Sequence, residues 1–381
     1  MSVRFARNAR TILALLAGGL LLSTPTSAVQ AGLTPTIAPL VPNAPVEVYD
    51  PPAGTYPYFP RSVFRERIPA NPAVDPNTAL WLAQTGATLG RFQFAENNDG
   101  LSEDYTFPIY MESANDPNLV PVRVHCTEPW GHCVAEGAVV RVDPRALPED
   151  GGQPTKDSHF AVISEAEHKE YDFWGTQWPP QDGILAIRWG GACSLDGDAT
   201  DGCTGTATGL PLSLGVVRVK DLFAATQTQN GSLPYAIAVG VRCANGRVFP
   251  AWRDDGHRPG CPPEGARVFL DMSDQDVNAS AAGALVKAML RTIDRDHYGM
   301  VITDINGGQY EFCFQVESDL TYTTKGLPGP LVTQLLPEAV SEGWAKPSAF
   351  NNKHYLRMKF PGIDFANELK FLPVGRVTDA R

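Results

Sequence analysis

The chain has 381 residues, of which 43% are hydrophobic and 19% charged, and its formal net charge is −11. The apolar fraction excludes an intrinsically disordered chain, and the acidic balance argues against nucleic-acid binding. Seven cysteines are too few for a small disulfide-built scaffold. We therefore expect a globular protein, and 35 Gly with 33 Pro predict many turns.

The N-terminus has the three-part layout of an export signal. Arg4, Arg7 and Arg10 precede an apolar run at 12–22, and small and polar residues follow to position 32. The run is shorter than the about 20 apolar residues that cross a membrane, so we expect cleavage and no stable membrane insertion. We predict a signal peptide at 1–31, an extended Pro-rich arm or linker at 32–60, and one large domain at 61–381. The mature protein would be secreted, either to the periplasm or to the medium.

Short β-branched or alternating segments recur between turn-forming residues through the middle of the chain. The expected strands are 120–125, 138–142, 160–164, 184–189, 235–241, 300–305 and 310–316. Helices are expected at 220–226 and within 280–296, where apolar residues recur at helical spacing. These elements predict a mostly β fold: a β-sandwich or jelly-roll-like domain with one or two helices packed on it.

The cysteines fall into neighbouring pairs, which agrees with export to an oxidising compartment. We predict three local disulfides, although six cysteines allow 15 pairings. The predicted disulfides are Cys126–Cys133, Cys193–Cys203 and Cys243–Cys261. Cys313 is left over, and its aromatic neighbours indicate a buried thiol.

Two segments have some features of metal sites. His125-Cys126 and His132-Cys133 could offer nitrogen and sulfur to zinc or copper, but a disulfide would remove the thiolates. The acidic loop 196–202 has Asp201 where an EF-hand loop needs Gly, and it lacks the Glu at position twelve. We expect a disulfide and a solvated turn, with weak calcium binding by 196–202 as the alternative and no other cofactor.

The catalytic candidates are polar residues beside predicted strands, because the nucleophile-elbow, zincin, nucleotide-binding and β-lactamase motifs are absent from the sequence. Asp157 and His159 are two residues apart, which on a strand would place both on one face about 7 Å apart. Glu170 and Asp172 repeat this spacing on a segment that could form a hairpin with the first. Together the four groups could supply the acid and base that hydrolysis or proton abstraction needs.

Further candidates surround this hairpin in the sequence. Trp174 and Trp189 offer indole faces of the kind that line ligand pockets, although both could equally be core residues. A Pro- and Gly-rich loop carries Asp255 and His257, and His257 is a further catalytic candidate. The remaining substrate-binding candidates are Arg188, Arg253, Asp255 and Asp304.

The order of these segments resembles a family of secreted bacterial proteins, common in actinobacteria and known mostly as hypothetical proteins. The similar segments lie within 105–316. In chain order they are Asp157–Phe160, Glu170–Trp174, Trp189–Gly191, Ala207–Leu212, Pro250-Ala251 with Asp255-Gly256, Gly265–Asp271 and Tyr298–Asp304. The resemblance implies a β-sandwich with an export signal and no established reaction. Where the family commonly has His-Ala-Leu, this chain has Tyr235-Ala236-Ile237, so an activity of relatives that needs that histidine would not carry over.

Two functions follow from these residues. The first is a secreted carbohydrate-active enzyme that cleaves a polysaccharide or oligosaccharide by acid/base catalysis. As a hydrolase it would use two carboxyl groups. As a lyase it would use His159 or His257 to remove a proton beside a uronate carboxylate, with arginines binding the polymer. The alternative is a non-catalytic extracellular envelope protein that binds a glycan or calcium.

Overall fold

The computed structural model describes residues 48–55, 58–87, 92–98, 106–113, 116–153, 155–306, 312–344, 353–358 and 360–375. All of them belong to one compact unit, Ile37–Arg381. The predicted signal peptide and most of the predicted arm lie outside the described residues. In the part of the chain that is described, no helix combines the length and the hydropathy needed to cross a membrane.

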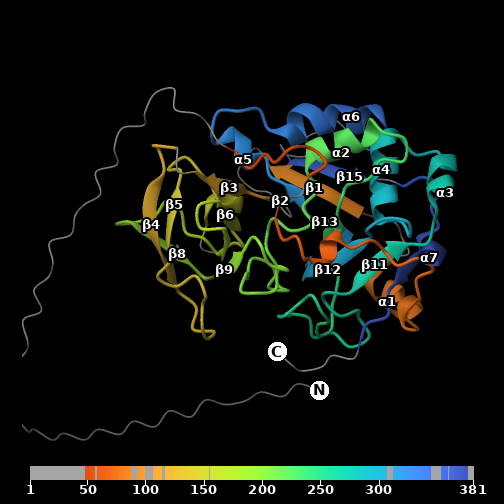
Figure 1. The fold of residues 1–381 in the computed structure, drawn as a ribbon, viewed down its shortest axis with the longest axis horizontal. Coiled ribbons are helices and arrows are strands. Elements are labelled where there is room, and N and C mark those ends of the chain that lie inside the picture. The colour runs from red at the N-terminus through yellow and green to blue at the C-terminus, as the bar shows by residue number, and fades with distance from the viewer. Residues whose placement is uncertain are drawn as a thin grey trace, which may run out of the picture. The chain divides into compact units, whose positions relative to one another are not determined.

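A mixed seven-stranded sheet lies at the centre of the larger part of this unit (Figure 1). Its strand order is β15–β1–β13–β10–β12–β11–β16, with β10 parallel to β12 and antiparallel to β13. The central strand β10 is buried at every residue, which explains its continuous apolar sequence. The strands are β1 Phe92–Asn98, β10 Ile237–Val241, β11 Arg267–Leu270, β12 Met300–Ile305, β13 Phe312–Phe314, β15 Lys353–Met358 and β16 Leu369–Phe371.

Short helices pack around this sheet and share its core. Helix α4 buries Leu285, Met289 and Ile293, the apolar residues that recur every four positions in the sequence. It also contacts α2. The helices are α1 Thr78–Thr85, α2 Val219–Thr226, α3 Asp274–Ala279, α4 Ala284–Ile293, α5 Leu320–Thr323, α6 Leu336–Ser341 and α7 Phe365–Glu368. A π-helical turn, Leu331–Leu335, precedes α6, and 3-10 turns form at Val63–Arg65 and Glu149–Gly151.

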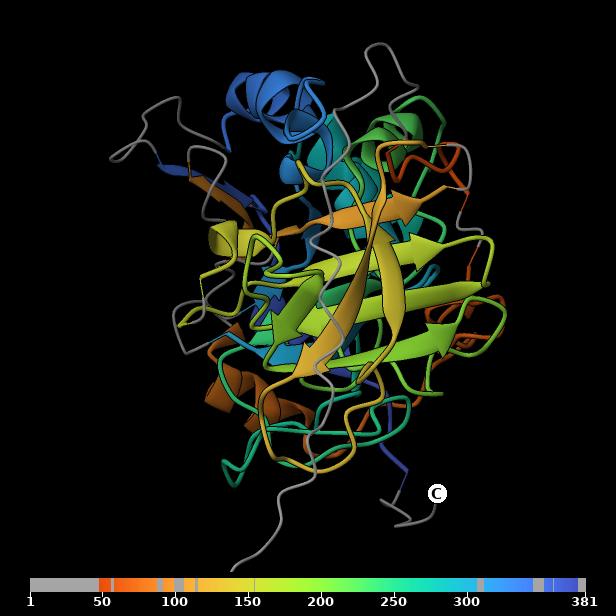
Figure 2. The same ribbon diagram turned by 90° about the vertical axis from the view of Figure 1, so that its left-hand side faces the viewer.

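Two small sheets are stacked on each other at one end of the unit (Figures 1 and 2). Side chains such as Val124 and Phe160 fill the space between them. The other face of the four-stranded sheet carries Ala161 and Ile163 into the main core, so that sheet is buried on both faces. The three-stranded sheet has the order β5–β4–β8, with β4 Val120–Cys126, β5 Val139–Val142 and β8 Ile184–Ile187. The four-stranded sheet has the order β3–β6–β7–β9, with β3 Ile109–Glu112, β6 Phe160–Ser164, β7 Lys169–Trp174 and β9 Trp189–Ser194. Strands β2 Thr106–Phe107 and β14 Val316–Glu317 pair in parallel.

The predicted mostly β fold is correct only in part. The structure is rich in sheet, but it is a mixed α/β fold in which 21% of the described residues are helical and 24% lie in strands. Sandwich-like packing of two sheets is confined to 109–194, whereas the largest sheet is covered by helices. Most of the unpredicted helices are too short to show a recognisable helical repeat of apolar residues. The predicted strands 160–164 and 300–305 match β6 and β12.

The described part of the predicted arm does not run free of the domain. Tyr49, Tyr58 and Phe59 are buried in the main core. The buried guanidinium of Arg218 donates hydrogen bonds to the carbonyl oxygens of Pro51 and Thr55. The expectation of an extended segment with little buried surface is therefore wrong for these residues, because three aromatic rings outweigh the effect of the prolines.

All three predicted disulfides are confirmed. Cys313 remains a thiol and is buried in β13, as predicted. Because the sulfurs of Cys126 and Cys133 are bonded to each other, they cannot act as thiolate ligands. His125 instead faces Glu136 at 3.4 Å.

Candidate functional site

Strands β6 and β7 form the predicted hairpin, with Phe160 opposite Phe173 and Ile163 opposite Glu170. Asp157 and His159, however, precede β6, and Ser158 between them has a φ of 41°. The prediction that both side chains lie on one strand face is therefore wrong. The predicted group of four is also divided, because Glu170 and Asp172 make their contacts elsewhere.

His159 is held at the start of β6 by a residue that the sequence did not mark. Its Nδ1 lies 2.5 Å from Oε2 of the buried Glu149, and its ring packs on Phe107 with centroids 4.6 Å apart. Burial, the largest single effect, lowers the pKa of His159, but the charge and hydrogen bond of Glu149 together with the charges of Asp157 and Asp304 raise it overall. The raised pKa of His159 favours its charged form, and Nδ1 is the ring nitrogen that faces Glu149.

Three carboxyl groups from distant segments act on one another, and one of them, Asp304, is also affected by the charge of His159. We call Asp255, Glu264 and Asp304 the carboxyl cluster. Burial and the charge of Asp255 raise the pKa of Asp304 to about 7, against the opposing charge of His159. Burial, a hydrogen bond with Asp255 and the nearby negative charges raise the pKa of Glu264 to about 10. Burial and the neighbouring carboxyl groups therefore favour the protonated form of Glu264.

Backbone geometry places the carboxyl cluster. Along β12, Val239 pairs with Ile302 and Gly240 with Asp304, so Thr303 is an extra residue that forms a bulge. Bulges re-aim the side chains beside them, and here the re-aimed residue is Asp304. The Cys243–Cys261 disulfide closes the loop that carries Asp255.

A turn at 206–209 fixes the same loop from the other side. The carbonyl oxygen of Thr208 accepts hydrogen bonds from the backbone N–H groups of Trp252 and Arg253, both at 3.1 Å. Gly209 has a φ of 79°, and a Cβ there would lie 2.5 Å from the indole of Trp252. Only glycine allows this close approach, which positions the guanidinium of Arg253.

Three tryptophans form a surface beside the carboxyl cluster, and we call them the aromatic platform: Trp130, Trp174 and Trp189. The ring centroid of Trp130 lies 5.6 Å from that of Trp174 and 5.8 Å from that of Trp189. The guanidinium of Arg188 lies 4.0 Å from the ring centroid of Trp174. Trp130 is 53% exposed, so the platform reaches solvent.

Two contacts join the aromatic platform to the carboxyl cluster. Trp174 Nε1 donates to Asp157 at 2.9 Å, and the charge of Asp157 acts on Asp304. On the other side, the guanidinium of Arg253 lies 5.9 Å from the ring centroid of Trp189 and close to the charge of Asp255. Trp189 Nε1 is buried and has no hydrogen-bond partner among the described residues. Asp157 and Arg253 therefore link the aromatic platform with the carboxyl cluster.

Glu170 and Asp172 form a separate buried carboxyl pair. The backbone N–H of Ser213 donates to Glu170 at 2.9 Å, and the Ser213 hydroxyl donates to its other oxygen. The N–H of Leu212 donates to Asp172 at 3.2 Å. Burial and the neighbouring Glu170 carboxyl group raise the pKa of Asp172. This pair holds the 205–213 loop against β7, so its contacts are structural.

The other predicted ligands lie apart from this site or are engaged. The His257 side chain is 83% exposed, and its Nδ1 lies 4.0 Å from Asp254, outside the carboxyl cluster. Arg188 also pairs with Glu128 at 3.0 Å. In the proposed calcium loop, Asp198 accepts hydrogen bonds from Thr200 and Asp201 accepts one from the N–H of Ser194, so these carboxylates stabilise their own turns.

Three residues of the site were missed in the sequence. Glu264 directly precedes the similar segment Gly265–Asp271, and Trp130 lies inside the Cys126–Cys133 loop, so both had a signal that could have been used. Nothing in the sequence marks Glu149, because its contact with His159 depends on the tertiary fold.

Together these residues define an acid/base site beside an exposed aromatic surface. The chain matches no family model, no curated protein and no solved structure. The resemblance to secreted bacterial proteins therefore stays a prediction, and function has to be argued from the site alone.

Proposed function

We propose that this protein is a secreted hydrolase that cleaves an uncharged polysaccharide or oligosaccharide at the carboxyl cluster. One observation supports this proposal best. Asp304, whose pKa is about 7, is affected by the charge of Asp157, and Asp157 accepts a hydrogen bond from Trp174 of the aromatic platform. Glycan hydrolysis needs one protonated and one ionised carboxyl group around the scissile bond. Three disulfides and an N-terminal export pattern favour an oxidising compartment outside the cytoplasm.

The roles follow from the protonation of each group. Asp304 is partly protonated near neutral pH, so it can give a proton to the leaving oxygen. Glu264 keeps its proton, which leaves its exposed neighbour Asp255 as the carboxylate that activates water or attacks the sugar. The His159–Glu149 pair places a positive charge near Asp304 and helps it to ionise after the proton has left.

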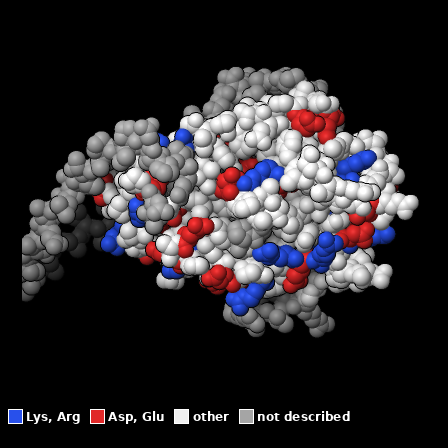
Figure 3. Space-filling model, turned by 45° about the horizontal axis from the view of Figure 1, so that its top comes forward, with Lys and Arg blue, Asp and Glu red and all other residues white. Residues whose placement is uncertain are grey.

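The charges of the site favour a neutral substrate over a uronate polymer. Four acidic residues, Asp157, Asp255, Glu264 and Asp304, act on one another there. A polyanion would be repelled by them, and the face shown in Figure 3 carries acidic and basic side chains intermixed, with no broad basic field among the coloured residues. The rings of the aromatic platform can instead pack against the apolar faces of sugar rings.

One observation favours a lyase as the second candidate. Arg253 makes no ion pair within 4.0 Å with a carboxylate of the described residues, so its guanidinium could bind a uronate carboxylate. His159 would then have to remove the proton through Nε2 in its neutral form, and the raised pKa of this histidine works against that role. This alternative predicts unsaturated uronate products, whereas the hydrolase predicts saturated ones.

The experiment is to incubate the mature protein with a panel of neutral and uronate polysaccharides and follow new reducing ends and the ultraviolet absorbance of unsaturated uronates. We expect reducing ends from a neutral glycan without absorbance. Asp304→Asn should lose activity by roughly 10² or more, and His257→Gln, changed at an exposed position outside the site, should keep it. Absorbance would establish the lyase instead. Glycan binding without turnover would establish the non-catalytic alternative, and the absence of both would reject a carbohydrate substrate.

A further inference from the structure

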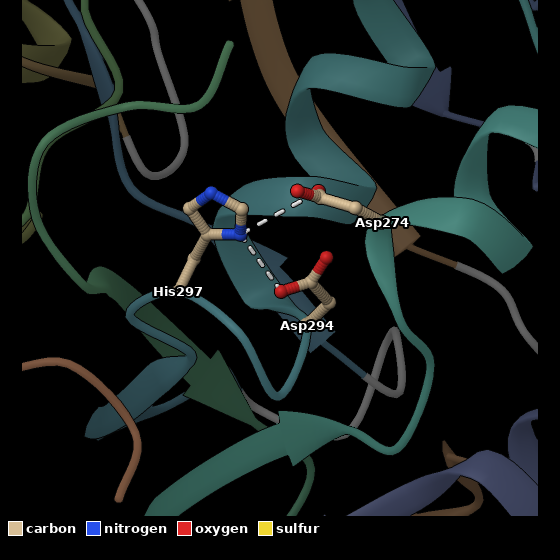
Figure 4. A group of neighbouring side chains, drawn as sticks. All are labelled: Asp274, Asp294 and His297. Carbon is tan, nitrogen blue, oxygen red and sulfur yellow. Dashed lines mark hydrogen bonds and ion pairs between the residues drawn. The ribbon is translucent and has the colours of Figure 1, made fainter. Parts of the chain in front are cut away.

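A second group of titratable side chains lies where α3, α4 and the turn before β12 meet, and it was not among the candidates from the sequence. Asp274 is the first residue of α3, Asp294 follows the last residue of α4, and His297 lies in the turn before β12 (Figure 4). His297 Nδ1 is 2.9 Å from Asp294 Oδ1 and 3.9 Å from Asp274 Oδ1. One ligand atom of each residue lies within 4.8 Å of the other two.

The buried oxygens of this group are not satisfied by the protein. The Asp294 side chain is fully buried, and its Oδ2 has no hydrogen-bond partner among the described residues. Asp274 Oδ1 is also buried without such a partner. In Figure 4 the two carboxyl groups and Nδ1 face a common gap. A buried carboxylate oxygen that lacks a partner is costly, so the gap favours a bound cation.

The nearest protein cation does not fill this gap. Arg291 Nε lies 4.0 Å from Asp274 Oδ1, which is too far for a hydrogen bond. Its two terminal nitrogens donate to the Gly231 carbonyl oxygen and to Asn278 Oδ1. Arg291 therefore offsets part of the negative charge from one side and leaves the facing oxygens without a partner.

We propose that Asp274, Asp294 and His297 bind one divalent transition-metal ion, with Zn²⁺ as the ion whose chemistry fits them best. Two carboxylate oxygens and one imidazole nitrogen are donors that zinc takes at about 2.0–2.2 Å, usually with four ligands in total. Water can supply the fourth ligand, because the Asp274 side chain is 30% exposed and opens the site to solvent. Magnesium and calcium prefer sites made of oxygen alone, so the imidazole argues against them.

The ion would act as a structural cross-link. It would tie the start of α3 to the turn that connects α4 with β12, two segments that are brought together by the packing of α3 on α4. Asp304 lies four positions beyond Met300, the first residue of β12, which is roughly 13 Å at the rise of a strand, whereas His297 lies in the turn before that strand. The metal site is therefore separate from the carboxyl cluster, and its test does not depend on the proposed hydrolase activity.

The test is calorimetric titration of the chelator-treated mature chain with ZnCl₂, in parallel with MnCl₂ and CaCl₂, together with thermal unfolding. We expect one Zn²⁺ per chain, weaker Mn²⁺ binding, little Ca²⁺ binding and a higher Tm with zinc. Asp294→Asn and His297→Gln should each weaken Zn²⁺ binding by about tenfold or more, since even outer-sphere changes cost that much. The matched control is His168→Gln, which removes an exposed histidine facing Asp196 at 3.4 Å and should bind like the wild type.

Asp274→Asn keeps the test decisive if the buried variants fail to fold. Its side chain is partly exposed, so the variant should fold and still lose at least tenfold in Zn²⁺ affinity. Absence of stoichiometric Zn²⁺ binding by the wild type would overturn the proposal, as would an unchanged affinity in Asp274→Asn. In either case water would be the partner of the buried oxygens.

Discussion

Two carboxyl pairs, one fully buried and one with a single buried member, have the same chemistry but different surroundings. In Glu170–Asp172 and in Asp255–Glu264, burial and a neighbouring carboxyl group raise a pKa. The first pair accepts hydrogen bonds from Ser213 and Leu212. In the second, Glu264 accepts none from the N–H and O–H groups of the described residues, and Asp255 is exposed to solvent.

The hydrogen-bond donors around a carboxyl pair therefore help to separate a structural pair from a reactive one. A carboxyl group that accepts hydrogen bonds from buried protein donors has fewer lone pairs left for a substrate, and its removal leaves those donors unpaired. A carboxyl group that accepts no hydrogen bond from a protein donor, beside an exposed ring, can exchange its proton with a ligand. A raised pKa occurs in both pairs and does not distinguish them, whereas backbone hydrogen-bond donors of the described residues contact only the Glu170–Asp172 pair.

The largest expected effect separates the two pairs by activity. Asp255→Asn should lower kcat by roughly 10² to 10⁴, because it removes the carboxylate assigned to water activation. Glu170→Gln should leave kcat of the folded protein within about threefold, because this pair lies outside the acid/base group. Steady-state assays on the glycan found active in the panel would measure both. Equal losses in the two variants would remove the distinction between the pairs.

The second effect separates them by stability. Glu170→Ala should lower the free energy of unfolding by about 3 kcal/mol, because the buried N–H and hydroxyl of Ser213 lose their acceptor. Glu264→Ala should cost less, since no protein donor is left unpaired and a buried acid is removed. Urea unfolding of both variants checks this order. A larger loss of unfolding free energy for Glu264→Ala would show that the Asp255–Glu264 pair also stabilises the fold.

The third effect is a dependence of stability on pH. The pKa of Asp304 is about 7 and that of Glu264 about 10, both above the ordinary values of these acids, so the folded state holds protons that the unfolded state releases. Their contribution is complete below about pH 4 and is lost as pH rises through the folded pKa. The raised pKa of His159 acts in the same direction.

We therefore expect the free energy of unfolding to fall by about 1 kcal/mol or more between pH 5 and pH 8. Asp304→Asn should flatten this slope, and urea unfolding at intermediate pH values would measure it. A wild-type stability that rises over this interval, or a slope unchanged in Asp304→Asn, would contradict the assignment of Asp304.

The smallest expected effect concerns substrate binding. Trp130→Ala should raise KM about fivefold and change kcat little, because a stacking contact of about 1 kcal/mol is lost at the solvent-facing end of the aromatic platform. Leu80→Ala, which truncates a side chain that is 47% exposed in α1, is the matched control. If the two variants have the same KM, Trp130 does not contact the substrate.

Short-range features of this chain were predictable from the sequence. The three disulfides close loops of neighbouring cysteines, and β6 and β12 are apolar runs between turn residues. Such features depend on residues close in the chain. His159, Asp255 and Asp304 were also identified as candidates, although the partners of each were not.

The partners depend on contacts between distant segments. Glu149 reaches His159 through a turn, the bulge at Thr303 aims Asp304, and Asp274 meets Asp294 only because α3 and α4 pack together. Which acids become reactive was therefore decided by tertiary structure. The sequence determined the disulfide loops, several strands and the types of side chain available. Burial, charge and hydrogen-bond donors set the pKa of each acid, and those exist only once distant segments are packed together.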